Sequence, residues 1–167
     1  MTLVAIASIR GGPPGTTWVA ASRDGVVQIN LGGPRQRFLR ELRARGYETG
    51  GKPVWVDAAA KQIREYLQGH RRSFRLKIVP PPQRPFSARV FRALQKVPFG
   101  RTVTYGELAA RAGSRHASRA VGNVMASNPL PIIVPCHRVV ATSGLGGFGG
   151  GLRLKRDLLR LEGARIP

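Results

Sequence analysis

The sequence is poor in the residues that usually hold metals or cross-link a fold. It contains one cysteine, Cys136, and three histidines, His70, His116 and His137. A single thiol cannot form an internal disulfide, and the histidines are too scattered for a zinc site. We therefore expect no metal and no cofactor, and the lone thiol is the residue that most needs an explanation.

Long hydrophobic runs are also missing. No apolar stretch approaches the roughly 18 residues of a membrane-spanning helix, and the opening MTLVAIASIR lacks the basic leader and apolar core of a signal peptide. We expect no membrane partner and a cytoplasmic location. The 42% hydrophobic content of the 167 residues suffices for the core of one domain or of two small ones.

Acidic residues are scarce, with 8 against 28 basic ones and a net charge of +20. This excess predicts a polyanionic partner, because non-specific contact with nucleic-acid phosphates requires only dense positive charge. The halves before and after residue 85 each carry +10, so neither is singled out as the binding surface. Most of the basic residues are arginines, and a general coding preference for arginine would give the same total without nucleic acid.

The first half has the pattern of a small α/β domain. Short apolar stretches separated by glycine-containing turns predict an antiparallel meander, and apolar residues at helical spacing predict two helices. The expected elements are strands at 3–9, 16–22, 25–31 and 74–79, and helices at 34–45 and 57–67. The proline-rich stretch PPPQRP then fits neither element. We predict an α/β domain over 1–79, a linker over 80–85 and a second domain over 86–167.

The second half is mainly helical in pattern. We expect helices at 87–96, 104–113, 117–126 and 152–162, a strand at 130–134 and a glycine-rich loop at 143–151. Thr104 and Glu107 have the spacing of a capping box. Two short helices joined by a turn that contains glycine outline a helix-turn-helix, whose second helix normally enters a DNA groove. A plain helical hairpin fits this pattern equally well.

The cysteine lies in the stretch VPCHRVV, residues 134–140. A buried, inert cysteine is common, but a reactive one needs a nearby base or cation, and His137 and Arg138 follow Cys136 directly. Neighbours in an extended strand face opposite ways, so the thiol and the imidazole can cooperate only if Pro135 turns the chain or a water bridges them. A carboxylate should orient the imidazole. The candidates in the second half are Glu107, Asp157 and Glu162, of which we choose Glu162.

Four segments resemble one known family. They are NPLPIIVPCHRVV at 128–140, VPFGRTVTYGELA at 97–109, SRAVG at 118–122 and GGGLRLK at 149–155. These segments are similar to the active-site signature, the helix-turn-helix and the glycine-rich loop of the O6-alkylguanine-DNA alkyltransferases, also called methylated-DNA–protein-cysteine methyltransferases. The resemblance covers residues 86–163, whereas residues 1–79 match only in length and element order.

The resemblance implies a fold and a partner. The fold would be an N-terminal ribonuclease-H-like α/β domain followed by a mostly helical, winged-helix-like domain. The partner would be double-stranded DNA that contains O6-alkylguanine, with O4-alkylthymine as a less certain substrate, bound by a nucleoid-associated monomer whose cooperativity on DNA stays open. The recognition helix, with Ser118 and Gly122, would enter the minor groove. Arg119 would intrude into the base stack, and Tyr105 would crowd the phosphate 3′ to the base.

The resemblance also implies a pocket and a chemistry for the everted base. Met125 and Phe148 would flank the purine, and backbone groups of Cys136, Val139 and Gly149 would read its edge. The Cys136 thiolate would attack the alkyl carbon, with His137 taking the thiol proton through water. Glu162 would orient His137, Asn128 would tie the recognition helix to the cysteine turn, and the Tyr105 hydroxyl would protonate the base near N3. The thioether product would make each molecule act once.

Several features depart from the family pattern. Many relatives have tyrosine where Phe148 stands and serine where Gly149 stands, so those side-chain hydrogen bonds are absent here. Some relatives carry arginine near Ala126, where this chain has none. Certain members bind zinc in the first domain through cysteine and histidine, and the absence of cysteine there predicts no such site.

Three alternatives compete with this interpretation. A non-enzymatic relative that binds alkylated guanine would have its acceptor cysteine replaced, so the presence of Cys136 argues against it. A helix-turn-helix regulator would leave the Cys136-His137 pair and the glycine-rich loop as coincidences. A cysteine hydrolase is disfavoured because the thiol follows proline and has no helix N-terminus behind it.

Overall fold

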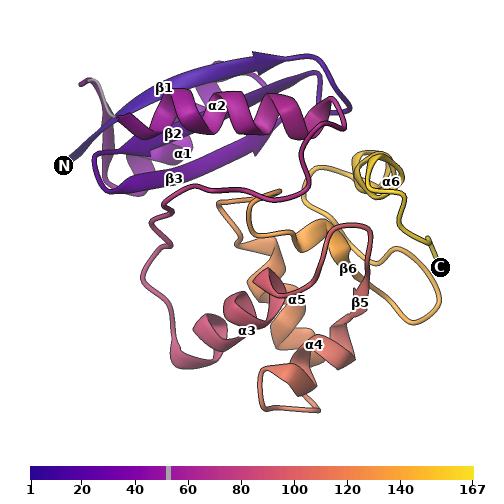
Figure 1. Cartoon of the computed structure of the whole chain (residues 1–167). Helices are drawn as coiled ribbons and strands as arrows, with labels where there is room; N and C mark the ends of the chain where they lie inside the picture. The colour runs from indigo at the N-terminus through magenta and orange to yellow at the C-terminus, as the bar shows by residue number, and fades with distance from the viewer. Residues whose placement is uncertain (52–53) are drawn as a thin grey trace. The chain divides into compact units, whose positions relative to one another are not determined.

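A computed structural model of the chain describes residues 1–51 and 54–167. The chain forms two compact units, Met1–Pro81 and Pro82–Pro167, whose elements are labelled in Figure 1. The predicted mixed α/β class is confirmed by the order of helices and strands. In the part of the chain that is described, no helix combines the length and the apolar character needed to cross a bilayer.

The first unit is built on a four-stranded sheet with the order β3-β2-β1-β4. Strands β1 (Thr2–Arg10), β2 (Thr16–Ser22) and β3 (Gly25–Leu31) form the predicted antiparallel meander. Strand β4 (Tyr47–Thr49) adds to the other side of β1 in parallel. Strand β4 was not predicted, because its three residues are too few to show an alternating pattern.

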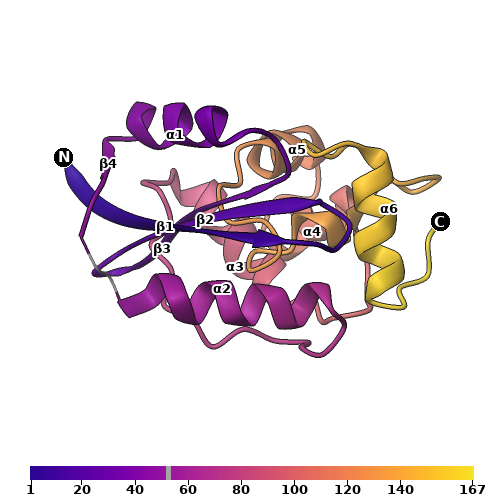
Figure 2. The same cartoon turned by 90° about the horizontal axis from the view of Figure 1, so that it is seen from above.

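Two helices cover opposite faces of this sheet, as Figure 2 shows from above. Helix α1 (Arg35–Ala44) places Phe38 and Leu42 in a buried cluster with Val4, Ala20 and Val27 of the strands. Helix α2 (Val54–Leu67) covers the other face, where it buries Ala59, Ile63 and Tyr66. Because both faces are covered, β2 is buried along nearly its whole length, which fixes its register in the sheet.

The strand expected at 74–79 is wrong in extent. Only Ile78 pairs with the sheet, through a bridge to Val26. Upstream, the Gln62 side chain bonds both backbone groups of Arg75, accepting from its N–H at 2.8 Å and donating to its carbonyl at 3.1 Å. This helix side chain therefore takes the place of a strand partner, and the prolines that begin at Pro80 prevent pairing beyond it.

The second unit is mostly helical, as predicted. It contains α3 (Pro85–Gln95), β5 (Val103–Thr104), α4 (Tyr105–Arg111), α5 (Ser118–Ala126), a 3₁₀ turn η1 (Cys136–Arg138), β6 (Val139–Val140) and α6 (Leu152–Leu161). Strands β5 and β6 form a short parallel pair that the sequence did not reveal. This pair joins the start of α4 to the segment that follows Cys136.

The capping box predicted at the start of α4 is confirmed. The Thr104 hydroxyl accepts from the Glu107 N–H at 3.1 Å, and the Glu107 carboxylate accepts from the Thr104 N–H at 2.8 Å. The helix ends where Gly113 adopts a φ of 84°, and α5 starts at Ser118. Helices α4 and α5 pack against each other and against α3, so the helix-turn-helix is part of a three-helix core.

We expect Gly25→Ala to destabilise the first unit more than Gly46→Ala does. Both glycines have positive φ, 141° and 81° respectively, so both substitutions strain the backbone. A Cβ on Gly25 would lie only 2.4 Å from the Lys77 carbonyl oxygen, whereas nothing lies within 4 Å of one on Gly46. Urea unfolding of the two variants measures the difference, and equal losses would contradict this account of the β3–Ile78 contact.

Candidate active site

The Asn128 side chain folds the segment before Cys136 into a compact turn. Its amide Nδ2 donates to the Val134 carbonyl at 2.8 Å, and its Oδ1 accepts from the Leu130 N–H at 3.0 Å. The Val134 N–H closes the turn by donating to the Leu130 carbonyl at 2.8 Å. The strand expected at 130–134 is therefore wrong, because one side chain satisfies backbone groups that a strand would leave to a neighbour.

This turn holds one residue in a strained conformation. Ile132 has a φ of 74° although it is β-branched, and its side chain is buried. Such a conformation costs about 1–3 kcal/mol and persists only where the surroundings enforce it. Burial of Ile132 and the Asn128 hydrogen bonds supply that enforcement, so the backbone leading into Cys136 is tightly determined.

Pro135 then bends the chain, as expected, into the 3₁₀ turn η1. The Cys136 N–H donates to the Val134 carbonyl at 2.8 Å, and the Arg138 N–H donates to the Pro135 carbonyl at 3.0 Å. The residues after Pro135 are therefore not an extended strand, and the alternation that would separate neighbouring side chains does not apply. Cys136, His137 and Arg138 are all buried.

The Glu162 carboxylate, at the end of α6, is the hub of the site. Its Oε1 contacts His137 Nε2 at 2.7 Å and Arg138 Nη2 at 2.9 Å. Its Oε2 accepts from Arg138 Nε at 2.9 Å and from the Gly100 N–H at 3.1 Å. Arg138 also donates through Nη1 to the Val97 carbonyl at 2.7 Å. Four donors on one buried carboxylate fix its position and the positions of the His137 imidazole and the Arg138 guanidinium.

These contacts set the protonation states. Burial alone would raise the pKa of Glu162, but the hydrogen bonds from His137 and Arg138 and the charge of Arg138 lower it well below its usual range. Burial lowers the pKa of His137, and this outweighs the opposite effect of Glu162. A neutral His137 donates its Nε2–H to Glu162, which leaves Nδ1 as the basic nitrogen.

The Cys136 thiol is protonated in the resting protein. Burial raises its pKa, and a hydrogen bond from Asn128, the charge of Lys155 and nearby backbone groups offset this only in part. A protonated thiol is a weak nucleophile, so its reaction requires a base that removes the proton. A neutral imidazole one residue away, held by a carboxylate, has the properties of that base.

Lys155 is a buried cation that the sequence analysis did not single out. Its side chain is fully buried, and Nζ donates to the Val139 carbonyl at 2.5 Å and to the Gly147 carbonyl at 2.9 Å. Burial lowers its pKa to about 8, against the opposite effect of Cys136. Its position on the apolar face of α6, three and four residues before Leu158 and Leu159, is the signal that could have revealed it.

Tyr105, the first residue of α4, packs against the glycine-rich loop. Its hydroxyl donates to the Gly147 carbonyl at 3.4 Å, and Lys155 Nζ lies 5.9 Å from its ring centroid. A Cβ on Gly146, whose φ is 70°, would lie 2.7 Å from the Tyr105 ring, so only glycine fits there. Burial raises the pKa of Tyr105, which keeps its hydroxyl protonated and able to donate.

Comparison with known proteins places the chain in a family. The family model described as 6-O-methylguanine DNA methyltransferase, DNA binding domain, matches residues 85–164. A methylated-DNA–protein-cysteine methyltransferase of Methanosarcina acetivorans is 45% identical over 107 residues, covering 64% of this chain and 68% of the relative. The chain belongs to this methyltransferase family. A Mycobacterium bovis member is 44% identical over 116 residues, covering 69% of this chain and 70% of the relative.

Solved structures extend the family likeness to both units. Mycobacterium tuberculosis OGT-R37K matches with a TM-score of 0.78 and 31% identity over 100% of this chain and 96% of that one. A crystal structure of Mycobacterium tuberculosis OGT in complex with DNA matches with a TM-score of 0.78 and 32% identity over 95% and 93%. The first unit, which resembled the family only in length and element order, thus shares the methyltransferase fold.

The structure brings some of the expected methyltransferase site residues together and leaves others apart. Cys136, His137, Glu162 and Asn128 form one cluster, in which Asn128 is half-buried and the other three are buried. Tyr105 adjoins this cluster through Lys155. Among the described residues, no side-chain hydrogen bond or ion pair joins the remaining expected residues to this cluster. Val139 is buried, and the others are exposed or half-buried: Ser118, Arg119, Gly122, Met125, Phe148 and Gly149. Arg138 was noted only as a nearby cation, although it holds Glu162 through two hydrogen bonds.

We expect the free energy of unfolding to fall as the pH drops below about 6.5. The lowered pKa values of His137 and Glu162 mean that the unfolded chain binds more protons than the folded chain in acid, so acid favours unfolding. The His137 contribution is complete above its unfolded pKa, and the Glu162 contribution is lost at still lower pH. Urea unfolding at pH values from about 8 to 4 measures this dependence. A flat profile would contradict the assigned protonation states.

At neutral pH, Glu162→Gln should lower the free energy of unfolding by about 3–5 kcal/mol, because it leaves Arg138 buried without its counter-charge. Asp157→Asn, which removes a less buried carboxylate from the same helix, is the matched control and should change stability little. Equal effects of the two substitutions would show that the Glu162 contacts do not hold the site.

We expect Lys155→Met to slow the alkylation of Cys136 by iodoacetamide at about pH 7, by up to about tenfold. The substitution removes the cation that lowers the pKa of the thiol, while methionine retains most of the packing. Arg156→Met removes an exposed cation from the adjacent position of α6 and is the control. The rate is measured by mass spectrometry of the intact protein. A rate unchanged in Lys155→Met would exclude this electrostatic effect.

Proposed function

We propose that this chain repairs duplex DNA by transferring the alkyl group of O6-alkylguanine directly and irreversibly to Cys136. The observation that carries the proposal is a buried, protonated thiol next in the chain to a buried, neutral His137, whose Nε2 lies 2.7 Å from the ionised Glu162. The thiol becomes a strong nucleophile only after the base has removed its proton. The resting protein therefore reacts only slowly with other electrophiles before it meets an alkylated base. Family membership and the likeness to a structure of OGT in complex with DNA support the substrate.

The proposed reaction is a direct displacement at the alkyl carbon by the Cys136 sulfur. His137 takes the thiol proton at Nδ1, directly or through one water, and Glu162 stabilises the imidazolium that forms. The sulfur then forms a bond to the alkyl carbon, and the carbon–O6 bond breaks with its electron pair staying on the guanine. The Tyr105 hydroxyl, kept protonated by its raised pKa, gives a proton to the departing base near N3. The proton that His137 took then returns to the Tyr105 oxygen through water, so both residues end in their starting states and the released base is neutral. The products are an S-alkylcysteine and a normal guanine, and no cofactor takes part.

In the proposed complex, the DNA lies against the helix-turn-helix of the second unit, which is formed by α4 and α5. Arg119 is exposed in the first turn of α5 and intrudes where the base leaves the stack. Gly122, one turn further along, has open space where a side chain would stand, so α5 can approach a groove closely. Eversion costs a few kcal/mol, least for a damaged base. Asn128 links the end of α5 to the cysteine turn, so binding and chemistry share one rigid segment.

The everted purine would sit between Met125 and Phe148, which are both half-buried. Backbone groups of Cys136, Val139 and Gly149 would read its edge, and Lys155 would hold the loop and the Val139 carbonyl in place for this role. Phe148 contributes ring packing alone, because it lacks a hydroxyl.

We further propose that the proline-rich stretch 80–85 joins two domains, of which the second carries both DNA binding and chemistry. The two compact units of the chain, whose boundary lies between Pro81 and Pro82, support this division. We also propose that the protein acts as a monomer near the nucleoid of the cytoplasm, in keeping with a net charge of +20 and a DNA substrate.

We expect incubation with a duplex containing O6-methylguanine to add the mass of one methyl group to the peptide that contains Cys136. Intact-mass and peptide mass spectrometry measure the transfer. Cys136→Ser should abolish it while leaving the affinity for DNA unchanged, because the hydroxyl is a far weaker nucleophile of similar size. A wild-type protein that binds the lesion without gaining mass would instead support the non-enzymatic binding alternative.

A further inference from the structure

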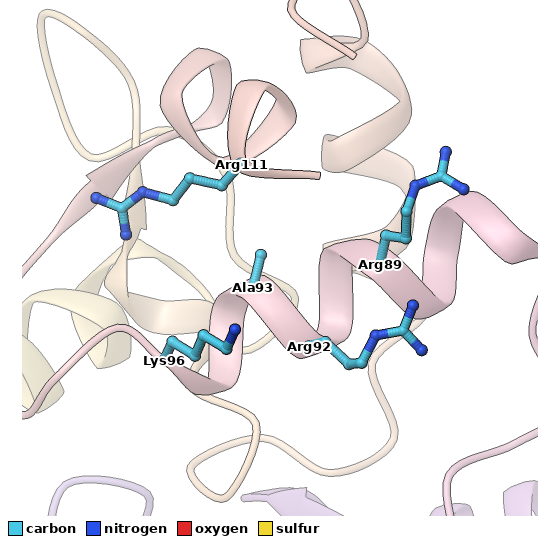
Figure 3. Close-up of a pocket in the computed structure, with 5 residues that line it drawn as sticks. All are labelled: Arg89, Arg92, Ala93, Lys96 and Arg111. Carbon is cyan, nitrogen blue, oxygen red and sulfur yellow. The ribbon is translucent and has the colours of Figure 1, made fainter. Parts of the chain in front are cut away.

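One surface of the second unit gathers basic side chains that the proposed reaction does not use. Helix α3 and the last turn of α4 border a hollow of about 470 Å³, lined by Arg89, Arg92, Ala93, Lys96 and Arg111. Figure 3 shows these residues, with the small side chain of Ala93 between the longer ones. We call this surface the α3 hollow. Four of its five lining residues are cationic, and none is acidic.

Local structure accounts for only part of this charge. Arg89 has a structural role, since its Nε donates to the Ala112 carbonyl at 2.8 Å and its guanidinium lies over the Phe86 ring. Among the described residues, the side chains of Arg92, Lys96 and Arg111 have neither a hydrogen bond nor an ion pair. A cation near a helix C-terminus is favoured by the helix dipole. This accounts for Arg92 in the last turn of α3 and for Arg111 in the last turn of α4, each taken alone.

The helix dipole does not explain the charges as a group. Lys96 is the C-cap residue of α3 and follows Arg92 by four positions, a spacing at which like charges repel each other. Arg111 adds a third positive charge from the facing helix. A bound anion would relieve this repulsion, so the arrangement fits a negatively charged partner.

The arrangement of the cations indicates which anion. In Figure 3 the guanidinium of Arg111 points away from those of Arg89 and Arg92, and the charged ends do not converge on one point. A site for one small phosphate or carboxylate needs donors that converge on it. Separate cations along a hollow instead match a chain of separate phosphates, as in a nucleic-acid strand.

We propose that the α3 hollow binds the phosphate backbone of DNA as a second contact beside the helix-turn-helix. The identity of the nucleic acid as duplex DNA rests on the proposed function. Helix α3 packs against both α4 and α5, and Arg111 lies at the α4 end of the turn that leads to α5. A strand running past α5 can therefore reach the hollow. The contact involves phosphates alone, so it raises affinity for DNA of any sequence and carries no lesion specificity.

The test removes the three unpaired cations together in Arg92→Gln/Lys96→Gln/Arg111→Gln. The matched control, Arg153→Gln/Arg156→Gln/Arg160→Gln, removes three exposed cations from α6 and changes the net charge equally. Affinity for an unmodified duplex is measured by fluorescence anisotropy at several salt concentrations. Each lost phosphate contact lowers the slope of log affinity against log salt by about 0.9, so the hollow variant should lose about 2–3 units of slope and the control less than one.

Single substitutions and small-anion binding test the details. Lys96→Gln and Arg111→Gln, both at exposed positions, should each lower the slope by about one. Titration with inorganic phosphate, followed by calorimetry, should show no saturable site. Equal slopes for the hollow variant and the α6 control would show a general charge effect and overturn the proposal, and so would tight, stoichiometric phosphate binding that the hollow variant loses.

A separate measurement distinguishes this proposal from the proposed function. Methyl transfer to Cys136, measured at saturating concentrations of lesion-containing duplex, should have the wild-type rate in the hollow variant. If the wild-type protein binds DNA through the hollow but gains no methyl group, the proposed reaction fails and the hollow stands. If transfer occurs while the hollow variant keeps the full salt dependence, the reaction stands and the hollow fails.

Discussion

The site depends on one buried carboxylate. Glu162 accepts hydrogen bonds from His137, from two nitrogens of Arg138 and from the backbone of Gly100, so it joins α6, the cysteine turn and the segment before β5. Removing a charge from such a cluster leaves its partners buried without compensation. The same contacts that hold the second unit together therefore also orient the His137 imidazole, so a substitution of Glu162 changes both the stability of the unit and the position of that ring.

The surroundings of Cys136 keep its thiol protonated, and therefore weakly nucleophilic, in the resting protein. Burial raises its pKa, although Lys155 and Asn128 act in the opposite direction. A permanently ionised thiol would react with oxidants and electrophiles in solution, whereas a protonated, buried one reacts slowly. In the proposed reaction, the neutral His137 takes the thiol proton. The charge of Lys155 lowers the pKa of the thiol, which helps its deprotonation, but the larger effect of burial keeps the thiol protonated at rest.

Sequence reasoning succeeded where the signal was periodic or local. The meander, the helices and the Thr104–Glu107 capping box follow from spacing and from turn residues. It failed at 74–79 and 130–134, where apolar runs resembled strands but the side chains of Gln62 and Asn128 took the backbone hydrogen bonds. The Gln62 contact joins residues 13 apart, which no local pattern records. The Asn128 contacts reach only 2 and 6 residues along the chain, so Asn128-Pro129 was a local turn signal that the apolar run outweighed. The roles of Arg138 and Lys155 were missed because each acts on groups distant in sequence.

Helix α6 supplies two groups that the cysteine turn lacks, Lys155 and Glu162, and the second lies 25 residues after His137. During translation the thiol leaves the ribosome before its imidazole has a carboxylate to hold it. A chain whose synthesis stops in between has the sulfur and the imidazole but not the carboxylate that holds the imidazole or the helix that packs against the cysteine turn. Its thiol would lack the burial that raises its pKa and would be open to oxidants, so the last helix both completes the site and protects the sulfur.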